Sequence, residues 1–405
     1  STHGVWDCTH TQNKNWIQLL TPPEETFSAR LAAAGYQTGY FGKWHVERSG
    51  QLNRFGWREF DIGCGGARLR ADPLTRRVAL ATPGYPDALL AGVDTATVNP
   101  RHPAFDRGID FIRRAAAEPN RPFCCFVSAV EPHDAYVPPR AFLDRYAIDR
   151  LPLPPSLRDD LADKPEAIRR IRSVWNGLSD DDWRFARAAY WAVISFLDAE
   201  VGRILTALRE TGQYDNTLIV FTSDHGDLLG AHGIPTKGIG TPYEEVYNIP
   251  CIIRAPGRPA GVEDRETRIS LVDLAPTVVD LCGTEPLPAA QGRSLRPVLE
   301  SAHFPADWRD AYAEFYGQRF VYTQRIVWHG DWKYVFNPAG IDELYDLARD
   351  PFERRNLAGD PRHRDTLLDL CRRMWRKMKA IGDDALYNTA YATLRTAPVG
   401  PLDAG

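Results

Sequence analysis

The chain has 405 residues, of which 43% are hydrophobic and 25% charged, and its formal net charge is −4. These proportions are ordinary for a soluble globular protein, and the length allows a large core and more than one domain. The small negative charge gives no support to nucleic-acid binding, and no apolar run of about 18 or more residues predicts a membrane span. The seven cysteines show no CxxC pair, which argues against a disulfide scaffold or a zinc site.

Helical and strand patterns alternate along the first half of the chain. A helix is predicted from the prolines and acids at 21–25, which suit a helix start, to a stop at Gly35. Residues 49–103 have weak periodicity and are predicted to be mostly loop. The remaining elements are a strand at 36–41, a helix at 105–117, and an apolar strand at 122–130 that we expect to be buried on both faces.

The second half begins with the clearest helix of the sequence. Ser179 to Asp182 predicts a capping box at its start, and Gly212 closes it. The elements that follow are a second and a third buried strand at 216–222 and 248–254, a helix opening at Asp273, a strand–turn–strand unit over 320–336, a strand at 343–347 and an amphipathic helix at 360–380.

This order of elements predicts an α/β fold with a central, mostly parallel sheet flanked by helices. The C-terminal strands and helix predict a smaller α+β subdomain. Because composition shifts near residue 300, we divide the chain into a larger α/β domain at 1–305 and a C-terminal subdomain at 306–405, with a small antiparallel sheet and a helix.

Polar residues cluster where three predicted strands end. In open parallel sheets, ligands gather outside the carboxyl ends of the strands, so these side chains are candidates for one site. They are Lys43 and His45, then His133 with Asp134, then Asp224 with His225, and, in the loop that follows, Lys237.

Asp224 and His225 are the sharpest of these candidates. A carboxylate beside an imidazole can reach one divalent cation, where the carboxylate suits magnesium, calcium or manganese and the imidazole suits manganese or zinc. The alternative is a solvated turn in which Asp224 caps the next helix, and the pair alone favours that alternative.

Lys43 and His45 are two residues apart, so they point the same way in an extended chain. A cation and an acid on one side of a strand end suit a bound oxyanion. The alternative is a surface lysine beside a buried, hydrogen-bonded histidine. His133 has the same two interpretations, Lys237 is equally compatible with an ordinary surface position, and His232 is expected to be a packing residue.

Taken together, these segments resemble the sulfatase family of the alkaline-phosphatase superfamily. The resemblance spans essentially the whole chain in the family's order, and five short motifs in sequence are far more specific than any one. The stretches are Gly42-Lys-Trp-His45, Glu131-Pro-His133, the segment Thr222 to Gly233, Lys237-Gly238 with Tyr243-Glu-Glu245 and 249–257, and Glu343 to Leu347 with Asp350-Pro-Phe-Glu353 and Asn356-Leu357.

The resemblance implies hydrolysis of sulfate esters. It also implies one divalent cation, for which calcium is the first candidate and manganese or magnesium are alternatives. The nucleophile of the family is a formylglycine made from a Cys/Ser-x-Pro-x-Arg motif. By match, Asp224 and His225 would be the metal ligands. Lys43 and Lys237 would bind the sulfate, Lys237 also near the leaving-group oxygen. The remaining expected roles are proton handling at the nucleophile by His45 and protonation of the leaving alcohol by His133.

Two features of the family are absent from this sequence. These are the adjacent aspartates after the family's first strand and the nucleophile motif, and Cys8 lacks the proline and arginine that the motif requires. We expect that the sequence begins after both features, so that the printed chain is a fragment lacking a central strand and is inactive by itself.

Three functions stay open. Sulfate-ester hydrolysis leads, with a small-molecule or saccharide sulfate ester as substrate and neither nucleic acid nor membrane as partner. His225 stands where many sulfatases have asparagine, which favours a phosphonate monoester hydrolase or phosphodiesterase instead. A non-catalytic relative that binds an anionic ligand would explain the missing nucleophile, but the intact polar set argues against it.

The segment 63–102 is the expected specificity region. Its arginines could meet an acidic sugar or form a solvated basic loop, and the sequence favours the loop. They are Arg68, Arg70, Arg76 and Arg77. The sequence leaves the compartment and the oligomeric state open.

Overall fold

The structure is a computed structural model that describes residues 25–46, 49–238, 240–258, 261, 263–264, 267–301, 306–317, 321–383 and 392–404. The helices are α1 (Phe27–Ala33), α2 (Pro103–Ala116), α3 (Arg140–Leu143), α4 (Glu166–Ser173), α5 (Asp180–Glu210), α6 (Glu244–Tyr247), α7 (Leu274–Leu281), α8 (Arg296–Ser301) and α9 (Arg364–Ile381). The strands are β1 (Gln37–Gly42), β2 (Glu59–Asp61), β3 (Val78–Leu80), β4 (Ala88–Ala91), β5 (Phe123–Ser128), β6 (Ile219–Thr222), β7 (Cys251–Arg254), β8 (Asp310–Gly317), β9 (Val321–His329), β10 (Trp332–Phe336) and β11 (Glu343–Asp346).

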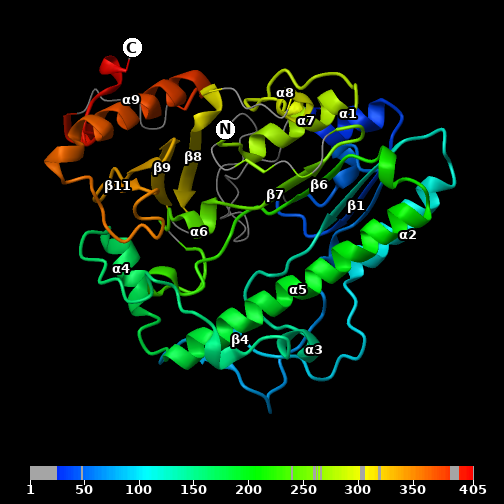
Figure 1. Cartoon of the computed structure of the whole chain (residues 1–405), viewed down its shortest axis with the longest axis horizontal. Helices are drawn as coiled ribbons and strands as arrows, with labels where there is room; N and C mark the ends of the chain where they lie inside the picture. Colours follow the sequence, from blue (N-terminus) through cyan, green and yellow to red (C-terminus); the bar gives the residue numbers. More distant parts are fainter. Residues whose placement is uncertain are drawn as a thin grey trace.

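A three-stranded parallel sheet in the order β2-β1-β5 lies at the centre of the first part of the chain. Figure 1 shows α2 and α5 on one side of these strands and α1 and α7 on the other. The alternation of β1 explains both contacts, because Phe41 packs on Phe111 of α2 while Tyr40 faces the opposite side and packs on Trp57. The parallel pairing and the helices on both faces agree with the predicted α/β class.

Strands β6 and β7 differ from the prediction of strands buried on both faces. They pair antiparallel with each other as a separate two-stranded sheet. Phe221 and Ile252 are 43% and 64% exposed, and Phe126 of β5 is 41% exposed. These exposed side chains show that the expectation is wrong for all three strands. Among the described residues β5 also pairs only with β1 and therefore lies at a sheet edge.

The helix starts show which local signals the sequence carries. Ser179 caps α5 as predicted, since its hydroxyl accepts from the Asp182 N–H and Asp182 accepts from the Ser179 N–H. The first helix begins later than predicted. Thr26 is the N-cap of α1 and accepts from the Ala29 N–H, while the predicted start at 21–24 lies outside the described residues.

The segment 49–103 is mostly loop, as predicted, but it carries short strands that the sequence did not indicate. β2 joins the central sheet beside β1, and β3 pairs with β4 in a hairpin. The hairpin packs on α5 through the cluster that contains Val78, Leu90 and Phe185. These strands have three or four residues each, which is too short for a period-two pattern to stand out.

The C-terminal part contains a four-stranded antiparallel sheet in the order β11-β10-β9-β8, with α9 packed on it. The predicted unit over 320–336 is confirmed, with β9 and β10 joined at Gly330. β8 was not predicted. The apolar face of α9 meets the sheet through Met374 and Trp375, which are 0% and 2% exposed.

Buried charges connect this sheet to the first part of the chain. Lys333 of β10 is fully buried, with its Nζ 2.7 Å from Glu353 Oε1 and 3.1 Å from Glu244 Oε1 at the start of α6. The side-chain amide of Asn356 donates to the Asp163 carbonyl at 3.0 Å. Because these contacts cross the predicted boundary, the division at residue 305 stays a proposal.

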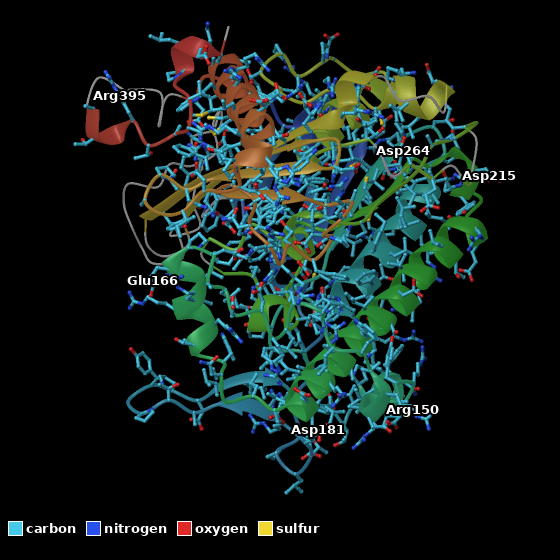
Figure 2. All side chains as sticks on the ribbon, turned by 60° about the vertical axis from the view of Figure 1, so that its left-hand side comes forward. Arg150, Glu166, Asp181, Asp215, Asp264 and Arg395 are labelled. Atoms are coloured by element: carbon cyan, nitrogen blue, oxygen red, sulfur yellow. The ribbon has the colours of Figure 1, made fainter. Side chains whose placement is uncertain are left out.

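Other charged residues, such as the labelled Arg150, Glu166 and Asp181, lie at the periphery (Figure 2). Among the described residues, no helix combines the length and the apolar character that crossing a bilayer requires.

Candidate active site

Lys43 is the first residue after β1, and a glycine sets its position. Gly42 has φ of +121°, and a Cβ there would lie 1.8 Å from the Ser128 carbonyl oxygen of β5. This close approach lets the Lys43 N–H donate to the same oxygen at 2.9 Å, while the Tyr40 hydroxyl donates to the Lys43 carbonyl. Lys43 Nζ then lies 3.6 Å from Asp224 Oδ2, at the end of β6.

His225 and Asp224 place two unprotonated atoms, an imidazole nitrogen and a carboxylate oxygen, near each other. The Nδ1 atom of His225 lies 2.8 Å from the Gly226 carbonyl oxygen, which can only accept, so Nδ1 carries the proton. Burial lowers the pKa of His225, which favours the neutral ring with an unprotonated Nε2. That Nε2 lies 3.7 Å from Asp224 Oδ1. Two unprotonated ligand atoms side by side suit a cation.

Gly226 pins the backbone beside this pair. Its N–H donates to the Val246 carbonyl at 2.8 Å, and a Cβ there would lie 2.0 Å from the Glu245 carbonyl oxygen. Burial raises the pKa of Asp224, but the charges of His225 and Lys43 outweigh it and leave the pKa below its ordinary value. Asp224 is therefore an ionised carboxylate at neutral pH.

His133 lies on the other side of His225, with 6.3 Å between the two ring centroids. Its Nδ1 lies 2.9 Å from both the carbonyl oxygen and Oδ1 of Asp134. Both partners only accept, so the proton sits on Nδ1 and Nε2 is left to exchange a proton with a bound molecule. The hydrogen bond to Asp134 raises the pKa of His133, while burial and the charge of Lys237 oppose that rise.

Glu131 and His102 fix the loop that carries His133. His102 is fully buried and its Nδ1 accepts from the Ala104 N–H at 3.2 Å, so its proton is on Nε2. Nε2 donates to Glu131 Oε2 at 3.0 Å, and Glu131 Oε1 accepts from the Ala67 N–H at 2.7 Å. The pair joins the loop to α2 and to the start of the predicted specificity region.

Lys237 completes the arrangement. Its charge lowers the pKa of both His133 and His225, and it lowers the pKa of Asp134 as well. Lys237 therefore lies on the side of the site where His133 and His225 are, and its N–H donates to Asp227, two residues after His225, at 2.7 Å.

His45 is exposed, two residues after Lys43, and its role stays a prediction. His232 is a packing residue, as expected, because it is fully buried and stacks on Tyr243 with 3.9 Å between the rings.

The described residues supply part of a cation site. Asp224 and His225 offer carboxylate oxygens and an imidazole nitrogen, which suit a divalent metal. No group of three or more His, Cys, Asp or Glu residues that could hold a metal occurs among the described residues. The remaining ligands would therefore come from water, substrate or residues outside the described ranges.

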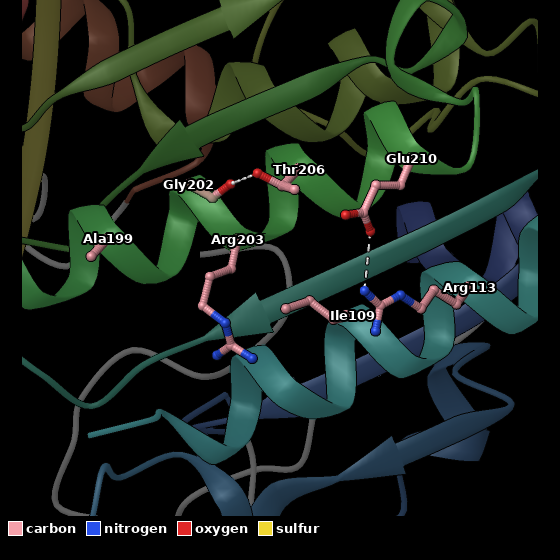
Figure 3. Close-up of a pocket in the computed structure, with 7 residues that line it drawn as sticks. All are labelled: Ile109, Arg113, Ala199, Gly202, Arg203, Thr206 and Glu210. Carbon is pink, nitrogen blue, oxygen red and sulfur yellow. Dashed lines mark hydrogen bonds and ion pairs between the residues drawn. The ribbon is translucent and has the colours of Figure 1, made fainter. Parts of the chain in front are cut away.

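A pocket of about 420 Å³ lies elsewhere, between α2 and α5 (Figure 3). Its charged groups are already paired, since Arg113 lies 3.1 Å from Glu210 and Arg203 binds Asp106 and Glu200. None of the predicted site residues lines it. We therefore assign the chemistry to the strand ends and not to this pocket.

Two of the four arginines in the specificity region show why that region is hard to interpret from sequence. Arg76 lies 3.7 Å from Asp182 and over the ring of Phe185, so it helps to attach the β3–β4 hairpin to α5. Arg68 is exposed and has φ of +59°. All four arginines are exposed, so the interpretation of a solvated loop stays open, and the Arg76 guanidinium also has a structural contact.

Comparisons with known proteins identify relatives along most of the chain. The family model described as sulfatase matches residues 3–284, and the model described as N-sulphoglucosamine sulphohydrolase, C-terminal, matches residues 230–380. The uncharacterised sulfatase YidJ of Escherichia coli K12 is 30% identical over 370 residues, which cover 87% of this chain and 72% of that protein.

Two solved structures share the fold. The phosphonate monoester hydrolase SpPMH from Silicibacter pomeroyi matches with a TM-score of 0.68 and 24% identity, over 95% of this chain and 85% of that chain. A protein solved with its substrate, D-glucosamine-2-N,6-O-disulfate, matches with a TM-score of 0.66 and 24% identity, over 90% of this chain and 85% of that one.

Proposed function

Because the chain belongs to the sulfatase family and has its alkaline-phosphatase-like fold, we propose that it hydrolyses sulfate esters. The observation that supports this most is the meeting of Lys43, Asp224, His225, His133 and Lys237 at the strand ends. The two lysines supply positive charge to this site, and positive charge complements a tetrahedral oxyanion.

Asp224 and His225 hold a divalent cation in this proposal. Sulfatases generally use a divalent metal and a formylglycine. When bound, the cation neutralises charge on the oxyanion and favours the ionised form of a nearby hydroxyl. We assign the nucleophile to no described residue. The ion is to be identified by experiment, and calcium is the first candidate.

The lysines bind and orient the substrate. Lys43 Nζ is held beside Asp224, which places one positive charge at the cation site, and Lys237 supplies a second on the side of His133. Together they hold the sulfate oxygens and fix the direction of the ester bond. Lys237 also stabilises the oxygen on which negative charge develops as the ester bond breaks.

His133 donates the proton to the leaving alcohol. Its Nδ1 is committed to Asp134, so Nε2 is the atom that carries the transferable proton, and Asp134 raises the pKa that controls this proton. His45, on the turn after Lys43, accepts the proton of the attacking hydroxyl group.

The second candidate is hydrolysis of phosphonate monoesters or phosphodiesters. It is favoured by the lone pair of His225 Nε2 beside Asp224, which suits manganese better than an amide oxygen does, and by the likeness to the phosphonate monoester hydrolase. The same two lysines can bind either oxyanion, so geometry alone gives both reactions equal access.

A substrate panel separates the two functions. We would compare kcat/KM for 4-nitrophenyl sulfate, a 6-O-sulfated glucosamine, 4-nitrophenyl phenylphosphonate and bis(4-nitrophenyl) phosphate, using protein expressed from its complete gene and supplied in turn with calcium and manganese. We expect a sulfate ester to be the best substrate. A preference for either phosphorus ester under both metals would overturn the proposal.

A further inference from the structure

We infer that Asp227 is a positioning residue that sets the place of Lys237 relative to His133. The inference rests on the proposed function. Asp227 lies two residues after His225 and is 8% exposed, and its two oxygens reach two different loops of the site. Oδ1 accepts from the Lys237 N–H at 2.7 Å, and Oδ2 accepts from the Tyr136 hydroxyl at 3.1 Å.

Tyr136 provides a fixed anchor on the His133 side. It lies three residues after His133 and is fully buried. Its N–H donates to the Leu90 carbonyl at 2.8 Å, and its ring packs edge-on against Tyr190 of α5, with 5.2 Å between centroids. The phenol is therefore held by β4 and α5, so it cannot move to follow a displaced partner.

The backbone before Asp227 is equally constrained. Gly226 is pinned against Glu245 and Val246, as described above, so the Asp227 side chain starts from a rigid point. Tyr136 holds Oδ2 of Asp227, and Gly226 holds the backbone before Asp227, so the position of Oδ1 is fixed. Because the Lys237 N–H is hydrogen-bonded to Oδ1, the position of the Lys237 backbone is fixed as well.

The loop between Asp227 and Lys237 explains why this bond matters. The loop doubles back on itself, since the Leu229 N–H donates to the Pro235 carbonyl at 2.8 Å and the Gly230 N–H donates to the Ile234 carbonyl at 2.9 Å. The bond from Asp227 to Lys237 lies at the base of this loop. Its loss would let the lysine side of the loop move, and a displacement of about 1 Å at a reacting centre costs about 10²-fold in rate.

A positioning role makes a prediction that a charge role does not. In Asp227→Asn, the amide oxygen still accepts from Lys237, and the amide nitrogen donates to Tyr136, whose own proton turns to the Pro235 carbonyl 3.3 Å away. The geometry therefore survives without the charge. In Asp227→Ala, both bonds are lost.

The test uses the enzyme expressed from its complete gene and a series of sulfate esters, from nitrophenyl to alkyl, with leaving groups of rising pKa. Lys237 stabilises the leaving oxygen, so losing its placement should matter most for the poorest leaving groups. We expect Asp227→Ala to lose about 10²-fold in kcat/KM on alkyl esters and clearly less on nitrophenyl sulfate. Asp227→Asn should stay within about tenfold of the wild type on every ester, on the same scale.

Two further variants sharpen the result. In a Lys237→Ala background, Asp227→Ala should add little, because the group that it positions is gone. Asp215→Asn changes a carboxylate whose side chain is 95% exposed at the far edge of the molecule, and it serves as the matched control (Figure 2). If Asp227→Ala does not fold, Tyr136→Phe removes one O–H group and should shift the leaving-group dependence in the same direction.

The failures are distinguishable. A wild type that turns over no sulfate ester overturns the proposed function, and this inference with it. With an active wild type, three results overturn the inference alone: an equal loss on all esters in Asp227→Ala, an undiminished further loss in the Lys237→Ala background, or Asp227→Asn behaving like Asp227→Ala.

Discussion

His133 donates its Nδ1 proton to Asp134, with 2.9 Å between Nδ1 and Oδ1, and this bond controls the acidity of the ring. The bond raises the pKa of His133. If the protonated ring is the general acid, activity falls as pH rises through that pKa. In Asp134→Asn the charge is lost and the pKa falls, so the falling limb of the kcat profile moves to lower pH.

The measurement is kcat against pH for an alkyl sulfate, whose departure needs protonation. Nitrophenyl sulfate is the control substrate, because its leaving group departs without an acid and its profile should move less. If Asp134→Asn does not move the falling part of the kcat profile for the alkyl sulfate, His133 is not the general acid.

Asp224 and His225 should carry the response to divalent ions. After chelation, adding calcium or manganese should raise the melting temperature of the wild type, since a ligand at 100 times its Kd stabilises by about 2.7 kcal/mol. Asp224→Asn and His225→Ala should lose most of that rise, and Asp215→Asn should keep it. Calorimetry checks this without an activity assay, and an unchanged rise in Asp224→Asn would place the ion elsewhere.

Asp342 should make stability depend on pH. Burial raises its pKa from 3.8 to about 6, so its proton is bound more tightly in the folded chain. The stability that the proton contributes is complete below about pH 4 and is lost as pH rises through 6. Asp342→Asn has no such proton to lose. Relative to the wild type, its free energy of unfolding should therefore increase by about 1–3 kcal/mol across that pH window. Urea midpoints at pH 4.5 and 7 provide the comparison, and a constant difference between the two proteins would contradict it.

The buried ion pair at Lys333 should be far more sensitive than a surface pair. Lys333→Met leaves the carboxylates of Glu353 and Glu244 without their cation, which should cost about 3–5 kcal/mol. Glu166→Gln breaks the exposed pair with Arg169 and should cost less than about 1 kcal/mol. Chemical denaturation of both variants tests the contrast, which equal losses would refute.

Two glycines should respond oppositely to alanine. Gly42→Ala forces a methyl group to within 1.8 Å of a carbonyl oxygen at a φ of +121°, so we expect a loss above about 4 kcal/mol or no folded protein. Gly202 lies inside α5 with nothing within 4 Å of the added methyl group, so Gly202→Ala should gain about 0.5–1 kcal/mol. Thermal unfolding distinguishes the two, and a tolerated Gly42→Ala would show that the β1–β5 approach is not tight.

Much of the fold could be predicted because its signals are local. The Ser179 cap, the turn at Gly330 and the polar residues at the ends of β1, β5 and β6 depend only on neighbours in sequence. Strand pairing does not. The antiparallel pairing of β6 with β7 depends on residues about 30 positions apart, and no local pattern states it.

The site divides in the same way. Lys43, His133, Asp224, His225 and Lys237 could be named from sequence because each follows a strand end or a recognised motif. Glu131, His102, Tyr136 and Asp227 act through tertiary hydrogen bonds, and their partners lie 29 and 91 residues away. Glu131 and Asp227 belong to the sulfatase-like motifs, two residues from His133 and His225. This closeness in sequence to a candidate residue is the only signal that could have indicated them.

The contacts around Lys333 have a consequence for protein engineering. Its two carboxylate partners come from either side of the predicted boundary, Glu244 before it and Glu353 after it. In a chimera that joins the first 305 residues to the C-terminal part of another sulfatase, Glu244 would face the residue that the other protein has in place of Lys333. Recombination between relatives should therefore exchange Glu244 together with the C-terminal strands, as one inherited unit.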